Sequence, residues 1–424
     1  MSVVAVAASG GRDSAALLHC TLRMAQPLGA NVVALHVHHG LQPEADAWCT
    51  QVRNQARRWG AGFDYRRLSS QPQPGDSIEA WARRERYAAL AEMALAQGAS
   101  MVLLAHHRLD QAETWLLQAL RGGGPAGLSA MPLMAQRHGL HWARPWLNQP
   151  RTAIDAYVLR HRLRVVDDAS NADARYARSR LRTQVWPVLL HAFPEAETTL
   201  AQSSRRAQEA AALATEIGQV DTAACTVDHS LQIPAWLALS TARRSNVLRS
   251  WLTQLGVDAV PESLVQRLMA DVPNLRSARF PVPGGELALY RGVLRHVQPT
   301  VKQHKAPVSA TIQLAIPGVS AVPAWHGDFV VQPCREGGAS TTTLQHLRLA
   351  SRQGSEQFQR SQRSLPRSLK KQWQAAAVPA WQRDGPLLYT ADGNLLFVPS
   401  LGIDARCWAA PGELQFSLHW QPSH

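Results

Sequence analysis

The stretch "AASGGRDSAALLH", residues 7–19, lies near the start of the chain and decides the fold prediction. It ends an apolar run, "SVVAVAA" at 2–8, that has the composition of a buried strand, and it continues into the apolar pattern of a helix. Glycines and serines between a strand and a helix are typical of a loop that binds phosphate through backbone N–H groups. A tight strand-to-helix turn capped by serine is the alternative interpretation.

The sequence around this loop alternates between two kinds of pattern. Apolar runs predict strands at 3–8, 31–37, 63–68 and 101–105. Helical patterns occupy 15–24, 45–59, 77–97 and 111–120. This alternation predicts an α/β fold with a doubly wound parallel sheet. Ligands of such sheets bind beyond the carboxyl ends of the strands, where the loop at 9–14 falls.

The rest of the chain changes character twice. Beyond about residue 194 the pattern becomes helical, and a polar stretch at 219–230 has the composition of a hinge. A second break at 298–311 precedes short β-like runs such as "DFVVQP" (328–333) and "NLLFVPSLGI" (394–403). We therefore expect three domains: a catalytic domain at 1–215, a helical middle domain at 216–300 and a small mixed α/β domain at 301–424.

The composition favours a nucleic-acid partner. The chain has 424 residues and a formal net charge of +13, and only four of its 44 basic residues are lysines. Arginine grips phosphate with a planar fork, although a GC-rich genome would also enrich arginine. Eight arginines face four acids between 151 and 182, and seven basic residues face one glutamate between 348 and 371. These stretches suit RNA phosphates, and solvated helix faces are the alternative.

Several function classes are disfavoured. The five cysteines are scattered and form no CxxC pair, which argues against a disulfide framework and against zinc or iron–sulfur sites. No lysine follows the glycines of the loop, so it is not a Walker A motif that serves γ-phosphate transfer. The apolar start is too short for a signal peptide, and no run approaches the roughly 18 apolar residues of a membrane span. We expect a cytoplasmic protein.

The loop "SGGRDS" resembles the pyrophosphate loop of the ATP pyrophosphatases, the PP-loop proteins, which cleave ATP between its α- and β-phosphates. Within that group, further segments resemble the tRNA(Ile)-lysidine synthase family. These segments are "HVHHGLQ" (36–42), "EAWARRERY" (79–87), "AHHRLDQAETWLLQALRGGGPAGLSAM" (105–131), "DDASNADARYARSRLR" (167–182) and "RSLKKQWQAAAVPAWQRDGPLLY" (367–389). The sequence departs from the family pattern at Leu109, where an acid is usual, and at Ser179, where asparagine is usual.

The resemblance implies a ligase for tRNA modification. Such an enzyme uses ATP and Mg²⁺ to join free L-lysine to C2 of the wobble cytidine in the CAU anticodon of isoleucine tRNA. The cytidine is first adenylated, and the products are lysidine, AMP and pyrophosphate. A homodimer is the working hypothesis for the oligomeric state. Two alternatives remain open, a PP-loop tRNA thiolation enzyme and a non-catalytic tRNA-binding protein. Only Cys20 and Cys49 are available for thiolation in the first domain, and an intact loop argues against loss of catalysis.

The predicted site residues fall into three groups. For the nucleotide we expect the loop to bind phosphate, with Asp13 also holding Mg²⁺; its residues are Ser9, Gly10, Gly11, Arg12, Asp13 and Ser14. For catalysis we expect Asp13, Arg83, Asp110 and Glu113. For tRNA we expect Arg175, Tyr176, Arg178, Arg182, Arg367, Lys370 and Lys371.

Alternatives remain for three of these assignments. Asp110 and Glu113 are three residues apart at a helix start, where they share a face and either serve a lysine ammonium or cap the helix. Arg83 shares a face with Arg86 to grip phosphate, or pairs with Glu79. The histidines of "HVHH" and "AHH" near the same site are expected to hydrogen-bond to ligands, with zinc binding as the alternative.

Overall fold

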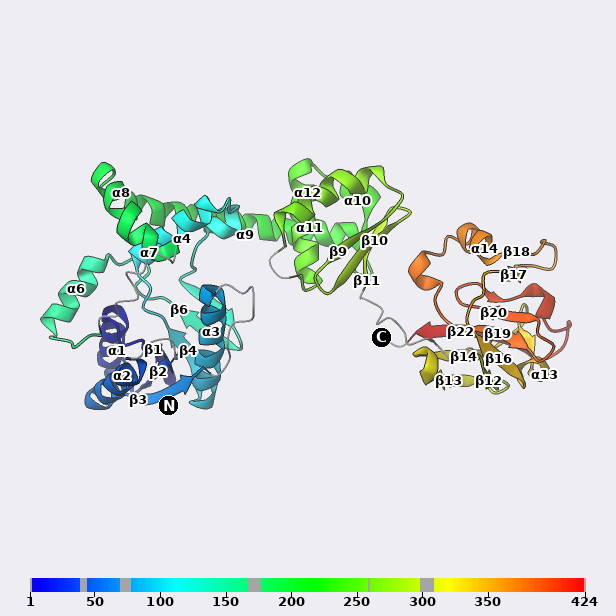
Figure 1. Cartoon of the computed structure of the whole chain (residues 1–424), viewed down its shortest axis with the longest axis horizontal. Coiled ribbons are helices and arrows are strands. Elements are labelled where there is room, and N and C mark those ends of the chain that lie inside the picture. The colour runs from blue at the N-terminus through cyan, green and yellow to red at the C-terminus, as the bar shows by residue number, and fades with distance from the viewer. Residues whose placement is uncertain are drawn as a thin grey trace. The chain divides into compact units, whose positions relative to one another are not determined.

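The computed structural model describes residues 2–38, 44–68, 78–166, 177–257, 260–297 and 309–422. The chain divides into two compact units, Met1–Val220 and Asp221–His424 (Figure 1). Arg175 and Tyr176, predicted to bind tRNA, lie outside the described residues. Within the described part, no helix is long and apolar enough to cross a bilayer.

The first unit is built on a mainly parallel sheet. Its strands, in sheet order, are β3 (Gly62–Arg67), β2 (Asn31–His38), β1 (Val3–Ala7), β4 (Ala99–Leu103), β6 (Leu140–Ala143) and β5 (Met134–Arg137). Strands β3, β2, β1, β4 and β6 pair in parallel, and β5 joins β6 as an antiparallel hairpin. The four predicted strands and the parallel sheet are confirmed. The β5–β6 hairpin was not predicted.

Helices α1 (Arg12–Ala25), α2 (Ala45–Trp59) and α3 (Ile78–Ala96) cover the two faces of this sheet. The unit also contains the helices α4 (Arg108–Leu120), α5 (Pro125–Leu128), α6 (Arg151–Arg160), α7 (Ala177–Arg180), α8 (Trp186–Ala192) and α9 (Ala196–Cys225), with a π-helical turn at Leu181–Val185. Along β1, Ala5 and Ala7 join the core that contains α3, whereas Val6 joins the core that contains α1 and α2. Successive side chains of a strand point to opposite faces, so an entirely apolar β1 has to be covered on both.

The order of the strands places the ligand crevice. β1 lies inside the sheet with β2 on one side and β4 on the other, so the chain winds in opposite directions from β1. A doubly wound sheet opens a crevice at the carboxyl ends of the strands at such a point. The loop after β1 and the start of α4 after β4 therefore lie at the same edge of the sheet.

The first part of the second unit combines helices with a sheet. The helices are α10 (Ile233–Leu237), α11 (Thr241–Gln254) and α12 (Glu262–Asp271). The antiparallel sheet has the order β7 (Thr226–Val227), β8 (Ser230–Gln232), β11 (Val293–Val297), β10 (Gly285–Tyr290) and β9 (Ser277–Val282). The helices were predicted, and the sheet was not.

The boundary between the two compact units falls within the polar stretch at 219–230, which was predicted to be a hinge, but the chain stays helical across this boundary. Helix α9 continues through it to Cys225. Asp221 is buried there, and Arg243 Nε donates to its Oδ2 over 2.8 Å. This ion pair lets a charged side chain face the core, so the polar composition does not break the helix.

The last part of the second unit is a mixed α/β structure, as predicted. One sheet has the order β12 (Ser309–Ile312), β16 (Leu347–Ala350), β19 (Leu387–Thr390), β20 (Leu395–Val398) and β21 (Gly402–Ile403). The other has the order β13 (Gly318–Val322), β14 (Gly327–Cys334), β22 (Gln415–Pro422) and β15 (Ala339–Ser340). The short strands β17 (Gln357–Phe358) and β18 (Arg367–Ser368) and the helices α13 (Thr341–Leu344) and α14 (Leu369–Ala375) complete it. A shared core includes Phe329 and Phe397.

Candidate active site

The loop between β1 and α1 requires glycine at position 10. Gly10 has φ +89°, which L side chains rarely adopt. A Cβ there would lie 3.0 Å from Val52 Cγ2 and 3.2 Å from Val166 Cγ2. The Val166 N–H donates to Gly10 O over 2.9 Å, so the segment after α6 holds the loop from outside. The positive φ and the close packing together disfavour any side chain at position 10.

Gly10→Ala is expected to weaken ATP binding about tenfold or more and to destabilise the first unit by about 1–3 kcal/mol. The strained φ and the close approach of the added Cβ both oppose the native loop. ATP titration and thermal unfolding measure the two effects. Gly29→Ala is the matched control, because Gly29 also has positive φ (+63°) but has no atom within 4 Å of the added Cβ. Equal reductions of ATP affinity in both variants would contradict this account of the loop.

The start of α1 provides an anion site. Its N-cap residue, Gly11, has no side-chain capping hydrogen bond. The Ser9 and Ser14 hydroxyls lie 3.0 Å apart, and Ser14 Oγ also donates to Gly11 O over 3.0 Å. The hydroxyls therefore shape the loop, while the first turn of the helix presents its N–H groups and positive dipole end. Arg12 pairs through Nη1 with Asp155 Oδ1 over 2.7 Å, which ties α1 to α6.

Asp13 has an unused carboxylate oxygen in the first turn of α1. Its Oδ1 is buried and has no hydrogen-bond partner among the described residues, and its Oδ2 lies 3.8 Å from His107 Nε2. Burial raises the pKa of Asp13, although His107 opposes the increase. A cation beside Oδ1 would stabilise the ionised carboxylate and offset the unfavourable effect of burial. Mg²⁺ is commonly held by one or two carboxylates together with substrate phosphates, so this residue beside an anion site fits Mg²⁺.

Two neighbouring histidines follow β4. The Nδ1 atoms of His106 and His107 are buried without a partner in the described structure. Burial lowers the pKa of His106 to about 3, so this ring is neutral near pH 7. The described residues contain no group of three or more His, Cys, Asp or Glu side chains arranged to hold a metal. The orphaned ring nitrogens are therefore available for hydrogen bonds to a ligand.

Asp110 caps the start of α4, which is one of the two roles predicted for it. The His107 N–H donates to Asp110 Oδ2 over 3.0 Å at the start of α4. Burial alone would raise the pKa of Asp110, but His107 and Arg178 lower it below its usual value. Asp110 is therefore a carboxylate at neutral pH. Capping does not remove it from the site, because His107 also faces Asp13.

Glu113 forms a buried ionic cluster with two arginines that were predicted to bind tRNA. Its side chain is fully buried, and Arg182 Nε donates to Glu113 Oε1 over 2.5 Å. Arg178 Nε donates to Glu113 Oε2 over 3.1 Å, and Arg182 Nη2 donates to Asp110 Oδ1 over 2.8 Å. Burial would lower the pKa of Arg182, but its bonds to Glu113 raise it. The cluster joins the segment at 177–182 to the face of α4 that carries both predicted acids.

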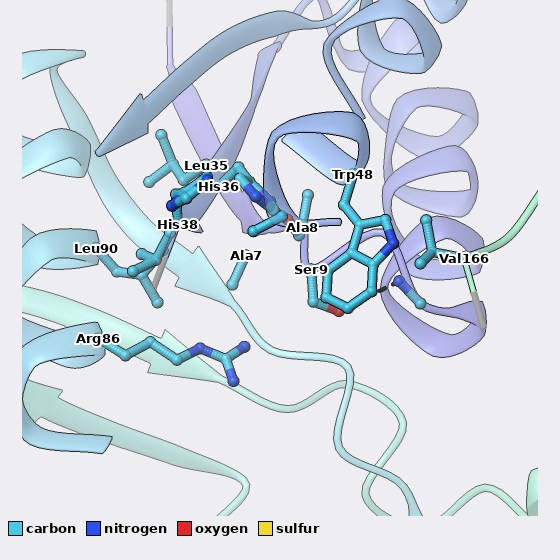
Figure 2. Close-up of a pocket in the computed structure, with 13 residues that line it drawn as sticks. Ala7, Ala8, Ser9, Leu35, His36, His38, Trp48, Arg86, Leu90 and Val166 are labelled. Atoms are coloured by element: carbon cyan, nitrogen blue, oxygen red, sulfur yellow. Dashed lines mark hydrogen bonds between the residues drawn. The ribbon is translucent and has the colours of Figure 1, made fainter. Parts of the chain in front are cut away.

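A cavity of about 290 Å³ lies beside the loop. In Figure 2, Trp48 stands near Ser9 and Val166, and Arg86 enters from the α3 side. His36 closes the strand side, with its Nδ1 2.8 Å from Ala8 O. The walls combine apolar side chains, such as Trp48 and Leu90, with polar ones, such as His36 and Arg86. Such a lining together with the phosphate loop at one edge suits a nucleotide.

The two arginines of α3 are placed differently. Arg86 is half-buried and lines the cavity, and burial lowers its pKa. Arg83 is exposed, and its guanidinium lies 5.4 Å from the centre of the Tyr87 ring. The side chain of Glu79, its alternative partner, is not among those described. Of the pair, Arg86 is therefore the residue that faces the cavity beside the loop.

Sequence reasoning missed Trp48 and Val166 and gave Arg86 no separate role. Trp48 is in the first turn of α2, and no motif distinguished it from a core tryptophan. Val166 reaches the loop only because α6 packs beside α1. In the second unit Arg367, Lys370 and Lys371, at β18 and α14, are all exposed.

A helix start that can bind an anion lies at the crevice of a doubly wound sheet, beside an Asp13 oxygen that has no partner among the described residues. This arrangement is typical of a nucleotide-binding protein. The family model described as a PP-loop domain matches residues 1–189. The models for the TilS substrate binding domain and the TilS substrate C-terminal domain match 231–295 and 347–420. The chain belongs to the tRNA(Ile)-lysidine synthase family.

Relatives along nearly the whole chain support this membership. The tRNA(Ile)-lysidine synthase of Ralstonia nicotianae is 40% identical, covering 99% of this chain and 93% of its own length. The synthase of Burkholderia mallei is 36% identical with the same coverage. That of Chromobacterium violaceum is 34% identical, covering 98% of this chain and 94% of its own length.

Proposed function

We propose that this chain ligates L-lysine to C2 of the wobble cytidine of isoleucine tRNA with a CAU anticodon, using ATP. The observation that carries the proposal is the orphaned Oδ1 of Asp13, at the start of α1 and close to the Asp110 and Glu113 face of α4. Family membership over nearly the full chain supports the substrate. The reaction belongs in the cytoplasm, where tRNA and ATP are available.

The order of events follows from the chemistry of cytosine. The O2 oxygen is a poor leaving group, so it is first adenylated, and the lysine ε-amine then displaces AMP from C2. In the first step Ser9, Gly10, Gly11 and Ser14 shape the cradle that binds the departing pyrophosphate. Asp13 would hold Mg²⁺, which would supply positive charge to the departing pyrophosphate. The cavity beside the loop takes the nucleoside part of ATP.

The second step needs a deprotonated amine. Free lysine has an ε-amine pKa of about 10.4, so a carboxylate has to hold the ammonium and accept a proton. We assign this role to the Asp110 and Glu113 face of α4. Arg178 and Arg182 orient these acids. We propose that both arginines also contact the tRNA. Arg83, which is exposed on α3, is proposed to contact phosphate.

The same proposal covers the organisation of the chain. A catalytic domain at 1–215, a substrate-binding domain at 216–300 and a tRNA-binding domain at 301–424 divide the work between chemistry and tRNA recognition. A homodimer remains the proposed oligomeric state. Arg175 and Tyr176 remain proposed to bind tRNA.

The nucleotide products test the reaction class. With tRNA and lysine, ATP is expected to yield AMP and pyrophosphate in equal amounts and no ADP, because the loop carries no lysine for γ-phosphate transfer. Chromatography of labelled nucleotides measures this. tRNA-dependent release of ADP would overturn the PP-loop assignment.

A thiolation enzyme is less well supported. Such an enzyme would need a reactive cysteine, and burial raises the pKa of the Cys49 thiol, which makes it a poor nucleophile at neutral pH. Cys20 is half-buried within α1. Incorporation of sulfur into the tRNA in place of lysine would favour this alternative.

The basic cluster at β18 and α14 provides a third prediction. Arg367→Ala/Lys370→Ala/Lys371→Ala is expected to raise the KM for tRNA about tenfold and to leave the KM for ATP and lysine unchanged. The salt slope of tRNA binding should fall by about one unit for each phosphate that the variant no longer neutralises. A control that replaces Arg137, Arg205 and Arg206, three exposed arginines of the first unit, removes the same charge and should leave the KM for tRNA unchanged. Unchanged tRNA affinity in the cluster variant would mean that the cluster is only a solvated face.

A further inference from the structure

The ends of three helices in the first unit form a second basic surface. We call it the arginine face, defined by the exposed residues Arg23, Arg57, Arg58, Arg160, Arg162 and Arg164. They belong to the last turns of α1, α2 and α6 and to the segment after α6. The three helices meet here, since α1 packs against α6 and Gln55 Nε2 of α2 donates to Arg164 O over 2.9 Å.

The arginine face is not neutralised internally. Within the described part of the chain, none of the six guanidinium groups forms an ion pair. Asp155, the acid on α6, forms an ion pair with Arg12. Glu113 pairs with Arg178, and Asp110 pairs with Arg182. A positive surface without counter-charges favours a polyanion as its partner.

A cluster of aromatic rings packs between the three helices that carry the arginine face. His19, Trp59, Tyr157 and His161 are half-buried between the three helices, and the centres of their neighbouring rings lie 4.4–5.8 Å apart. His19 Nδ1 lies 2.8 Å from the Tyr157 hydroxyl. Burial lowers the pKa of His19 and raises that of Tyr157 to about 12, so this pair is uncharged near pH 7. The arginines therefore lie around a packed ring cluster in which His19 and Tyr157 are uncharged.

The surface connects directly to the phosphate loop. The chain leaves Arg164 and two residues later, at Val166, donates its N–H to Gly10 O over 2.9 Å. Val166 also lines the cavity beside the loop. A ligand bound across the arginine face would therefore extend to the edge of the candidate active site.

We propose that the arginine face binds the sugar-phosphate backbone of the substrate tRNA, independently of base sequence. Arginine forks match phosphate oxygens, and interactions of this kind set the register of an RNA without reading it. An anionic membrane is the competing partner, because Met24 and Leu159 are exposed nearby. RNA is favoured because the arginines come from the ends of three elements and not from the polar side of one amphipathic helix. That this RNA is isoleucine tRNA rests on the proposed function, whereas the binding of an RNA backbone rests on the arginine face itself.

The test measures binding without turnover. Arg57→Gln/Arg58→Gln/Arg160→Gln in the full chain is titrated with an isoleucine tRNA transcript at several salt concentrations, without ATP or lysine. The expected result is an affinity at least about tenfold weaker near 0.1 M salt and a salt slope smaller by about two to three units. Thermal unfolding near that of the wild type verifies that the variant is folded.

The control replaces Arg121, Arg137 and Arg205 with glutamine, since these are exposed arginines of the same unit outside the arginine face. It is expected to retain its affinity within about twofold. Equally weakened binding in both variants would show that only net charge matters and would overturn the proposal. Unchanged tRNA binding together with abolished binding to phosphatidylserine vesicles would assign the face to a membrane and also overturn it. A protein that makes no lysidine but shows the predicted slopes would contradict the proposed function alone.

Discussion

Replacing Asp13 with asparagine is expected to reduce tRNA-dependent AMP formation about a thousandfold or more, while tRNA affinity stays within a few-fold of wild type. The variant keeps the size of the side chain but removes the charge that would hold Mg²⁺ at the start of α1. Quenched-flow or steady-state measurement of AMP gives the rate. Asp64→Asn on β3 is the control, because it removes one half-buried carboxylate away from the loop and should retain full activity. Substantial turnover by the Asp13 variant would remove this residue from the mechanism.

The same variant should also change how the stability of the protein depends on pH, which replacement of a merely structural residue would not do. Burial raises the pKa of Asp13 in the folded chain. The folded state therefore binds more protons than the unfolded state just above the usual carboxyl range, and stability without ligand falls as pH rises there. Asp13→Asn should lack this component and unfold at a higher temperature than wild type near pH 7. A variant that is inactive and also less stable would instead indicate a damaged fold.

Glu113→Ala is expected to destabilise the first unit by about 3–5 kcal/mol, because it leaves two arginines beside a buried site without their partner. Both Arg178 and Arg182 donate to this fully buried carboxylate. Denaturant unfolding of the wild type and the variant measures the change.

Two further variants sharpen this test. Glu113→Gln keeps one acceptor oxygen and should be less destabilised than the alanine variant. Glu92→Ala removes a carboxylate that is 59% exposed and pairs with Arg66, so it should change the free energy of unfolding by no more than about 1 kcal/mol. If Glu113→Ala and Glu92→Ala were equally mild, the ionic cluster would not be a fixed part of the fold.

The sequence predicted those features that depend on local pattern. The apolar run before Ser9, the glycines after it and the strand–helix alternation were enough for the sheet and the loop. The spacing of Asp110 and Glu113 correctly placed both on one side of α4. Their partners could not be predicted, because Arg182 comes from 69 positions further along the chain and reaches Glu113 only in the folded state.

Other features needed the tertiary structure for a different reason. The strands β7 and β8 have only two and three residues. They are too short to show the alternation of apolar and polar residues that identifies a strand in a sequence. Arg83 and Arg86 are equivalent by helical spacing, and only the packing of α3 shows that Arg86 lines the cavity. Trp48 lines it because α2 starts beside the loop.

The central claim is lysine transfer to the wobble cytidine, and one incubation tests it most directly. The full chain is mixed with ATP, Mg²⁺, radiolabelled lysine and unmodified isoleucine tRNA with a CAU anticodon, alongside the same tRNA with the wobble cytidine replaced by uridine. The account predicts label in the first tRNA, one AMP released for each lysine attached, and no label in the second. Absence of label in the first tRNA with an active, ATP-binding protein, or equal labelling of both, would contradict it.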